Sequence, residues 1–132
     1  MNGTFDIVVD ADRDLVVMRL AGFFDADALD RLLAARAVAA RRLRCGPNRH
    51  LSLTDISAIS IQAQDMVAAF GAVLSDPSFR SRRLAFVVAT SLARVQLRRA
   101  LGGRIENDVA FFTDEAAAMR WLVRGDERRA AA

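Results

Sequence analysis

The sequence predicts a single α/β domain with a mostly parallel sheet and an antiparallel edge strand, in the order β-β-α-β-α-β-α-β-α. The chain opens with two apolar strand patterns joined by a short polar link. After them, helical and strand patterns alternate to the end of the chain, which favours right-handed crossovers between parallel strands. Its length of 132 residues and its hydrophobic fraction of 53% are sufficient for one core.

The opening hairpin is expected over residues 4–9 and 15–20. Phe5, Ile7 and Val9 recur at every second position, so they share one face of a strand. The second segment, LVVMRL, is almost entirely apolar. Because the polar link between the segments is short, we expect them to pair antiparallel.

The first helix is expected from Asp25 or Asp27 to about Arg44, after Gly22 breaks the strand pattern. A carboxylate at this position accepts hydrogen bonds from free backbone N–H groups and suits the positive end of the helix dipole. Gly46-Pro47-Asn48 then ends the helix. Its apolar stripe consists of Leu29, Leu32, Leu33, Val38 and Leu43.

Three further strand–helix units are predicted. The strands are expected at 49–54, 84–89 and 107–112, and the helices at 62–74, 90–101 and from Thr113 onward. Residues 55–61 stay ambiguous between the end of a strand and a loop. The run LAFVVA at 84–89 is apolar on both faces, as in a buried parallel strand.

The domain is expected to comprise residues 1–124, with 125–132 as a frayed tail. Thr113 is the expected N-cap of the last helix, with Asp114 and Glu115 in its first turn. No apolar run approaches the roughly 20 residues that span a bilayer, and the first residues lack the pattern of a signal peptide. We therefore expect a cytoplasmic protein.

Composition argues against several functions. All 19 basic residues are arginine and the net charge is only +3, so specific nucleic-acid binding is not expected. Cys45 follows three arginines that would favour its thiolate, but it is the only cysteine, and a small residue near a helix end is the simpler interpretation. His50 is the only histidine and stands at a strand start. We therefore expect no metal site, no cofactor and no enzymatic activity.

Three phrases of the sequence resemble the STAS domain family: LAGFFDADALDRLLAA (20–35), LSLTDISAIS (51–60) and VAFFTDEAAAMRWL (109–122). The similarity is greatest to the SpoIIAA-like, or STAS/SEC14-like, branch and covers residues 4–123. It implies a SpoIIAA-like single domain acting as a non-enzymatic regulatory or protein-interaction module, as anti-anti-sigma domains do, with homodimerisation left open. The SEC14-like branch name implies an alternative, a carrier or sensor of a small apolar or anionic ligand.

The same resemblance implies a phosphorylation site after the central strand. Regulatory members carry Asp-Ser-(Ser/Thr)-Gly there, with the acceptor directly after the aspartate. This chain has Asp55-Ile56-Ser57-Ala58, so Ile56 stands at the acceptor position. Ser57 and Ser60 are the remaining candidates, and a phosphate on either would add negative charge near Asp55. The alternative is that both are unmodified loop serines.

A ligand or partner face is expected beyond the carboxyl ends of the parallel strands, where open sheets bind ligands. Helix N-termini in this region suit anions, and Arg94 would add a charge-assisted contact. The alternative is that these polar side chains are ordinary helix caps. The candidate residues are Asp55, Ser57, Ser60, Thr90, Ser91, Arg94 and Thr113.

Aromatic side chains offer either a core or the lining of a small-molecule pocket, and the core is the favoured interpretation. Phe79 is the least expected in a core, because it lies among serine and arginine. The set consists of Phe23, Phe24, Phe70, Phe79, Phe86, Phe111, Phe112 and Trp121.

Overall fold

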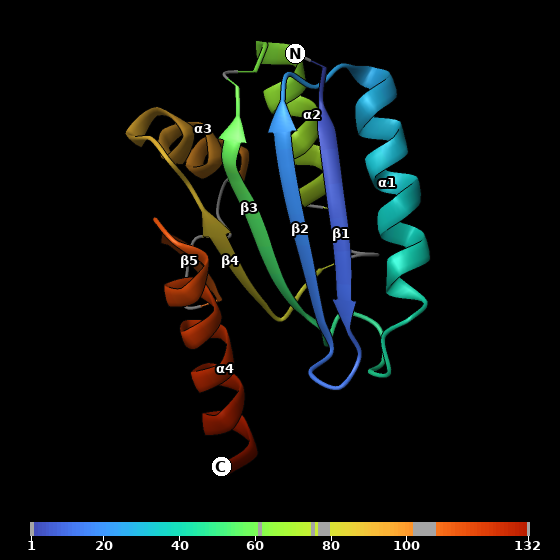
Figure 1. Cartoon of the computed structure of the whole chain (residues 1–132), viewed down its shortest axis with the longest axis vertical. Helices are drawn as coiled ribbons and strands as arrows, with labels where there is room; N and C mark the ends of the chain where they lie inside the picture. The colour runs from blue at the N-terminus through green and yellow to red at the C-terminus, as the bar shows by residue number, and fades with distance from the viewer. Residues whose placement is uncertain (1, 61, 75, 77–79, 102–107, 132) are drawn as a thin grey trace.

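The computed structural model describes residues 2–60, 62–74, 76, 80–101 and 108–131. Its strands form one sheet in the order β1-β2-β3-β4-β5 (Figure 1). β1 is antiparallel to β2, and the other neighbouring strands are parallel. The predicted element order and the mixed sheet with an antiparallel edge strand are therefore confirmed.

The central strand is longer than the sequence indicated. β3 continues to Ile59 because β2 also continues past its predicted end, and the two strands pair through Gly22 and Ile59 after a register shift. Most of the ambiguous segment 55–61 is therefore strand. The strand bounds are Thr4–Asp10 for β1, Leu15–Gly22 for β2, Leu51–Ile59 for β3, Arg83–Val87 for β4 and Val109–Phe112 for β5.

Helix α1 begins after Asp25, which is one of the two residues predicted to cap it. The Asp25 carboxylate accepts a 2.8 Å hydrogen bond from the backbone N–H of Ala28. The prediction that the helix runs to Arg44 is wrong, since α1 spans Ala26–Ala40. Beyond it, Asp14 Oδ1 accepts hydrogen bonds from the backbone N–H groups of Arg44 and Cys45, which ties this segment to the β1–β2 turn.

The last helix starts one residue later than predicted. Asp114 Oδ1 accepts a 2.8 Å hydrogen bond from Ala117 N, so Asp114 provides the N-terminal cap and the assignment to Thr113 is wrong. The helical backbone of α4 also continues through most of the segment assigned to a tail, while fraying there stays a prediction. The helix bounds are Gln64–Leu74 for α2, Ser91–Leu101 for α3 and Glu115–Ala131 for α4.

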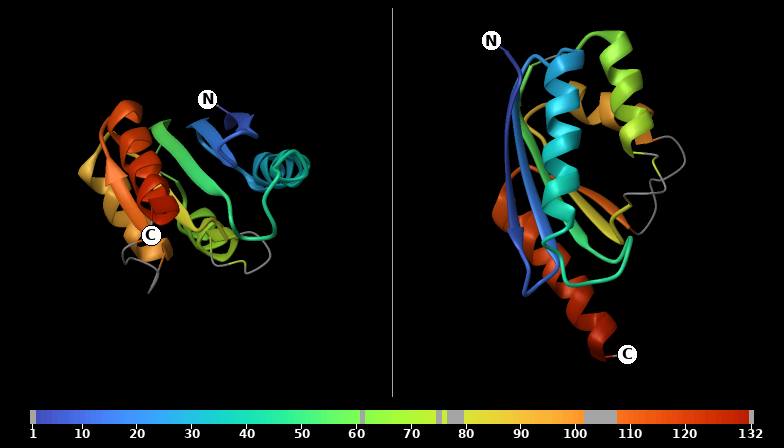
Figure 2. Two further views of the ribbon diagram at one scale, coloured as in Figure 1. Left: turned by 90° about the horizontal axis from the view of Figure 1, so that it is seen from below. Right: turned by 90° about the vertical axis from the view of Figure 1, so that its right-hand side faces the viewer.

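The helices divide unequally between the two faces of the sheet (Figure 2). α1, α2 and α3 lie on one face, over a core that includes Leu20, Ile56 and Phe86. α4 lies on the other face, where Ala118 and Leu122 pack with Leu15, Val17, Leu51, Leu53, Ala85 and Val87. Because side chains alternate along a strand, neighbouring residues of β3 contribute to different cores.

None of the helices in the part of the chain that the structure describes is long and apolar enough to cross a bilayer.

Candidate functional site

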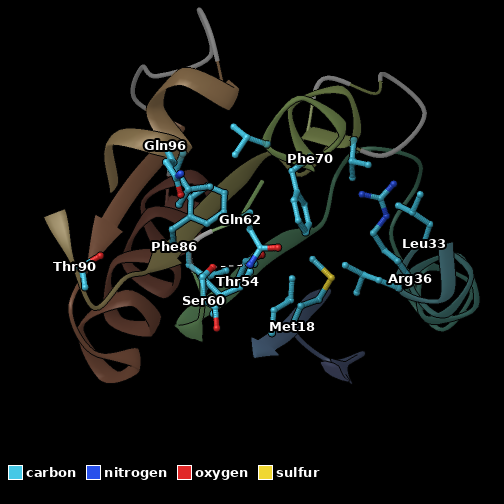
Figure 3. A pocket seen from close by; sticks show the side chains of 17 residues that line it. Met18, Leu33, Arg36, Thr54, Ser60, Gln62, Phe70, Phe86, Thr90 and Gln96 are labelled. Atoms are coloured by element: carbon cyan, nitrogen blue, oxygen red, sulfur yellow. Dashed lines mark hydrogen bonds between the residues drawn. The ribbon is translucent and has the colours of Figure 1, made fainter. Parts of the chain in front are cut away.

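An apolar pocket of about 270 Å³ lies between the sheet and the helices α1, α2 and α3 (Figure 3). Alternating strand positions bring side chains of β2, β3 and β4 to its floor. The floor consists of Met18, Leu20, Thr54, Ile56 and Phe86.

Three helices provide the walls of this pocket. α1 and α2 present residues spaced three or four apart, which share one face of a helix, and α3 presents two adjacent residues. Near the carboxyl ends of the strands, Ile59, Ser60, Gln62 and Thr90 complete the lining. The wall residues are Leu32, Leu33 and Arg36 from α1, Val67, Phe70 and Val73 from α2, and Gln96 and Leu97 from α3.

Aromatic contacts fix two sides of the pocket. Phe70 meets Phe24 edge to face with ring centroids 5.6 Å apart, and Phe86 stacks on Phe111 at 5.7 Å. Phe24 is 1% exposed and belongs to the core against which Phe70 packs. Phe70 and Phe86 therefore line the pocket, while Phe86, at 1% exposed, also belongs to the core, as the favoured interpretation expected for most of the aromatic residues.

The remaining aromatic residues lie elsewhere. Phe112 of β5 and Trp121 of α4 contact each other, with their ring centroids 5.8 Å apart. Phe23 is 45% exposed. Phe79 lies outside the described residues.

Arg36 is the one residue with a formal charge among the described residues that line the pocket. It is half-buried, and burial lowers the pKa of its guanidinium, which the charge of Asp76 partly offsets. In Figure 3, Arg36 lies beside Leu33, across the pocket from Thr90. The sequence carried a signal for it, since Arg36 follows Leu32 by four residues and Leu33 by three in the apolar stripe of α1.

Gln62 closes the lining at the carboxyl edge of the sheet. Its Oε1 accepts a 2.9 Å hydrogen bond from Phe24 N, and its Nε2 donates to Gly22 O at 3.1 Å and to Ser60 O. Gly22 has a φ of 82°, a left-handed conformation that glycine adopts without steric cost. One side chain thus joins the end of β2, the start of α1 and the segment after β3.

The sheet separates the predicted site residues into two groups. Ser60 and Thr90 line the pocket. Asp55 pairs with Arg19 of β2 in the parallel register, on the face that α4 covers, so it is turned away from the pocket. Ser57 is exposed, and its hydroxyl donates a 2.6 Å hydrogen bond to Asp55 Oδ1. The predicted residues therefore do not all border the pocket, and their use as a ligand or partner face stays a prediction.

The residue at the implied phosphorylation position has a structural role instead. Ile56 is 8% exposed and contributes to the pocket floor. Since it lies between Asp55 and Ser57 on a strand, its side chain projects to the opposite face from theirs. Phosphorylation of Ser57 or Ser60 stays a prediction.

The other candidates of the carboxyl edge do not reach the pocket. Ser91 is the first residue of α3, and it and Thr113 are exposed. Arg94 is exposed on α3, and its guanidinium carbon lies 5.5 Å from the centroid of the Phe111 ring. Neither Ser91, Arg94 nor Thr113 is among the lining residues.

Arginine side chains lie on both faces of the sheet. Arg83 lies 3.8 Å from the ring centroid of Trp121, on the α4 side. Arg98 lies 5.5 Å from the Phe111 ring, on the α3 side. The absence of specific nucleic-acid binding stays a prediction.

An ion-pair network lies on the α4 side of β2. Arg19 donates two 2.8 Å hydrogen bonds to the two carboxylate oxygens of Glu115, and Asp6 lies 3.7 Å from the same guanidinium. The Arg19 hydrogen bond chiefly lowers the pKa of Glu115 from 4.5 to about 2. The pair joins the start of α4 to β2.

Removal of this pair is expected to change acid stability. Because the folded pKa of Glu115 lies below its ordinary value, its stabilisation is present above pH 4.5 and is lost as the pH falls toward about 2. Both partners are partly exposed, so Glu115→Gln is expected to remove about 0.5–1 kcal/mol at neutral pH. Urea unfolding of both proteins at several pH values, from neutral pH down to about 2, measures this contribution to stability. Equal pH dependence of wild type and Glu115→Gln would contradict the prediction.

Neither Cys45 nor His50 is among the described residues that line the pocket. Burial, with a further contribution from Asp14, raises the pKa of the Cys45 thiol. The expectation that the preceding arginines favour its thiolate is therefore wrong. His50 is 3% exposed directly before β3, at the amino end of the strand. Within the described ranges, no group of three or more His, Cys, Asp or Glu residues is placed to hold a metal ion.

The chain matches no protein-family model, and no curated protein matches it in sequence. Among solved structures, it is similar to an uncharacterized protein of the DUF3478 family from Shewanella loihica PV-4, which has a SpoIIAA-like fold. The similarity covers 92% of this chain and 94% of that one, with a TM-score of 0.65. This chain has a SpoIIAA-like fold.

The resemblance inferred from the sequence is confirmed at the level of the fold. The SpoIIAA-like neighbour is 15% identical to this chain, and it is itself uncharacterized. The similarity therefore extends to architecture alone. A function has to be argued from the pocket and the surface of this SpoIIAA-like domain.

Proposed function

We propose that this protein is a non-enzymatic binding domain for a small, mostly apolar ligand, acting as its carrier or sensor. The observation that carries the proposal is the pocket of about 270 Å³ beneath α1, α2 and α3. Its volume lies just below the range of about 300–1,000 Å³ that is usual for ligand pockets. Each methylene group that leaves water for such a pocket contributes roughly 0.8 kcal/mol.

The polar groups of the lining support binding more than catalysis. Thr54, Ser60, Gln62, Thr90 and Gln96 are neutral, and Arg36 carries a permanent positive charge. The described lining has no histidine, cysteine, aspartate or glutamate, the groups that most often transfer protons or activate a nucleophile near neutral pH. Neutral polar groups of this kind orient a ligand by hydrogen bonds.

Two measurements test this function. Protein purified from its native cells is extracted with organic solvent, and the extract is analysed by mass spectrometry for a small molecule present in stoichiometric amount. The same protein after extraction and refolding is titrated with decanol, a neutral apolar probe, in a calorimeter. We expect saturable binding that raises the unfolding temperature. No extracted ligand together with no decanol binding would refute the proposal.

A second role, protein interaction at the carboxyl edge of the sheet, is supported by an exposed aromatic residue. Phe23 is 45% exposed and directly follows Gly22, which pairs with Ile59 at the end of β3. Exposed aromatic side chains often anchor protein interfaces. The exposed Ser57 lies near this end of β3, so a phosphate there would alter the charge of the same region.

Affinity capture from native cells tests this second role. A partner that the wild type retains and the Phe23→Ser variant loses would support an interface there. Identical capture by the two proteins would count against it. Association of two copies of the chain stays a prediction.

A further inference from the structure

We propose that the ligand is a monocarboxylate with a single apolar chain of medium length, bound with its carboxylate at Arg36 and its chain between Phe70 and Phe86. This inference rests on the proposed ligand-binding function and names the chemical class that the pocket selects.

Arg36 determines where the head group lies. It is the charged residue of the described lining, whereas Thr90 and Gln96 offer only neutral groups on the other side of the pocket (Figure 3). The planar guanidinium matches the two oxygens of a carboxylate. Arg36 is half-buried at the wall of the pocket, so an anion that enters meets this guanidinium as the cation of the described lining.

The remaining lining determines the shape of the chain. Phe70 of α2 and Phe86 of β4 face the interior, and Met18, Leu33 and Leu97 extend the apolar surface around them. A cavity of about 150 Å³ holds one benzene molecule. The volume of about 270 Å³ is therefore sufficient for one medium-length chain and too small for a lipid with two long chains.

Asp76 restricts the charge of the head group. Its negative charge partly offsets the lowering of the Arg36 pKa by burial, so Asp76 and a bound anion would both interact with the same guanidinium. A dianionic head group, such as a phosphate monoester, would be repelled by Asp76 and met by one lining cation. A monocarboxylate carries a single negative charge, so Asp76 repels it less than a dianion while it still pairs with Arg36.

The test compares two probes of equal chain length, decanoate and decanol, by calorimetric titration of wild type and Arg36→Gln. Arg36→Gln is expected to weaken decanoate binding about tenfold, the loss expected for one charge-assisted hydrogen bond. Its effect on decanol is expected to stay within about twofold. The matched control is Arg31→Gln, an equal change of charge at an exposed residue of the same helix, which should leave both affinities unchanged.

A second variant keeps the proposal testable if Arg36→Gln fails to fold. Asp76→Asn removes the competing carboxylate and is expected to tighten decanoate binding about threefold without changing decanol binding. Equal loss of both probes in Arg36→Gln, or no change of decanoate affinity in either variant, would overturn the inference. Wild type that binds decanol as tightly as decanoate would overturn it while leaving the proposed function intact. If the wild type binds neither probe and yields no extracted ligand, both this inference and the proposed function are refuted.

Discussion

Val67→Trp is expected to abolish saturable decanol binding, with at least a tenfold loss of affinity. Val67 lies on α2 and lines the pocket. A tryptophan at this position occupies volume that the ligand would need, and the close packing of protein interiors leaves little room for compensation. Calorimetric titration measures the affinity.

Ala68→Trp is the matched control for this experiment. Ala68 is the next residue of α2, it is exposed, and it is not among the lining residues. The same side chain at this position should leave ligand affinity within about twofold of wild type. Because overpacking costs about 1–3 kcal/mol, circular dichroism and urea unfolding must first show that Val67→Trp is folded. Undiminished decanol binding by a folded Val67→Trp variant would place the ligand elsewhere.

Leu122→Ala is expected to lower the free energy of unfolding by about 2–5 kcal/mol, the range for truncation of a buried leucine. Leu122 is 0% exposed and packs with Leu53 and Ala85 beneath α4. The truncation leaves a cavity where this helix covers β3 and β4. Urea unfolding followed by circular dichroism measures the loss, with exposed Arg120→Ala on the same helix as the control that should change stability little.

Ligand binding should survive this large loss of stability. Leu122 belongs to the core beneath α4, and the pocket lies on the opposite face of the sheet. While the variant remains folded, we expect decanol affinity within about twofold of wild type. A large drop in affinity in folded Leu122→Ala would show that the two faces are coupled and that the binding site is not confined to the helical layer of α1, α2 and α3.

Local patterns were sufficient to predict the architecture. Alternating apolar residues in β1 and the continuous apolar run of β4 reflect how many faces of each strand are buried, which is a property of the residues themselves. Asp25 was recognisable as a cap because its carboxylate bonds to a backbone group three residues away. Where a distant partner fixes an end, prediction failed: α1 stops before Arg44, whose backbone N–H bonds to Asp14, a residue of the β1–β2 turn.

Local sequence patterns could not predict the pocket, because residues far apart in the chain form it. The sequence placed Asp55, Ser57, Ser60 and Thr90 on one expected face, and the sheet puts Asp55 on the side opposite to the pocket. The extension of β3 decides this, because strand geometry turns successive side chains to opposite faces.

The sequence alone determined the α/β class and the order of the elements, since burial and capping act over a few residues. The SpoIIAA-like fold was implied by the resemblance of three phrases to a known family. Only the tertiary structure decided that Arg36 and Gln62 border a pocket. Arg36 was visible as an interruption of an apolar stripe, but its meaning depends on α2 and α3 closing over the same face of the sheet. Gln62 acquires its role by bonding to Gly22 and Phe24, which lie about forty residues earlier in the chain. Such contacts form between elements brought together by folding, so no local window of sequence contains them.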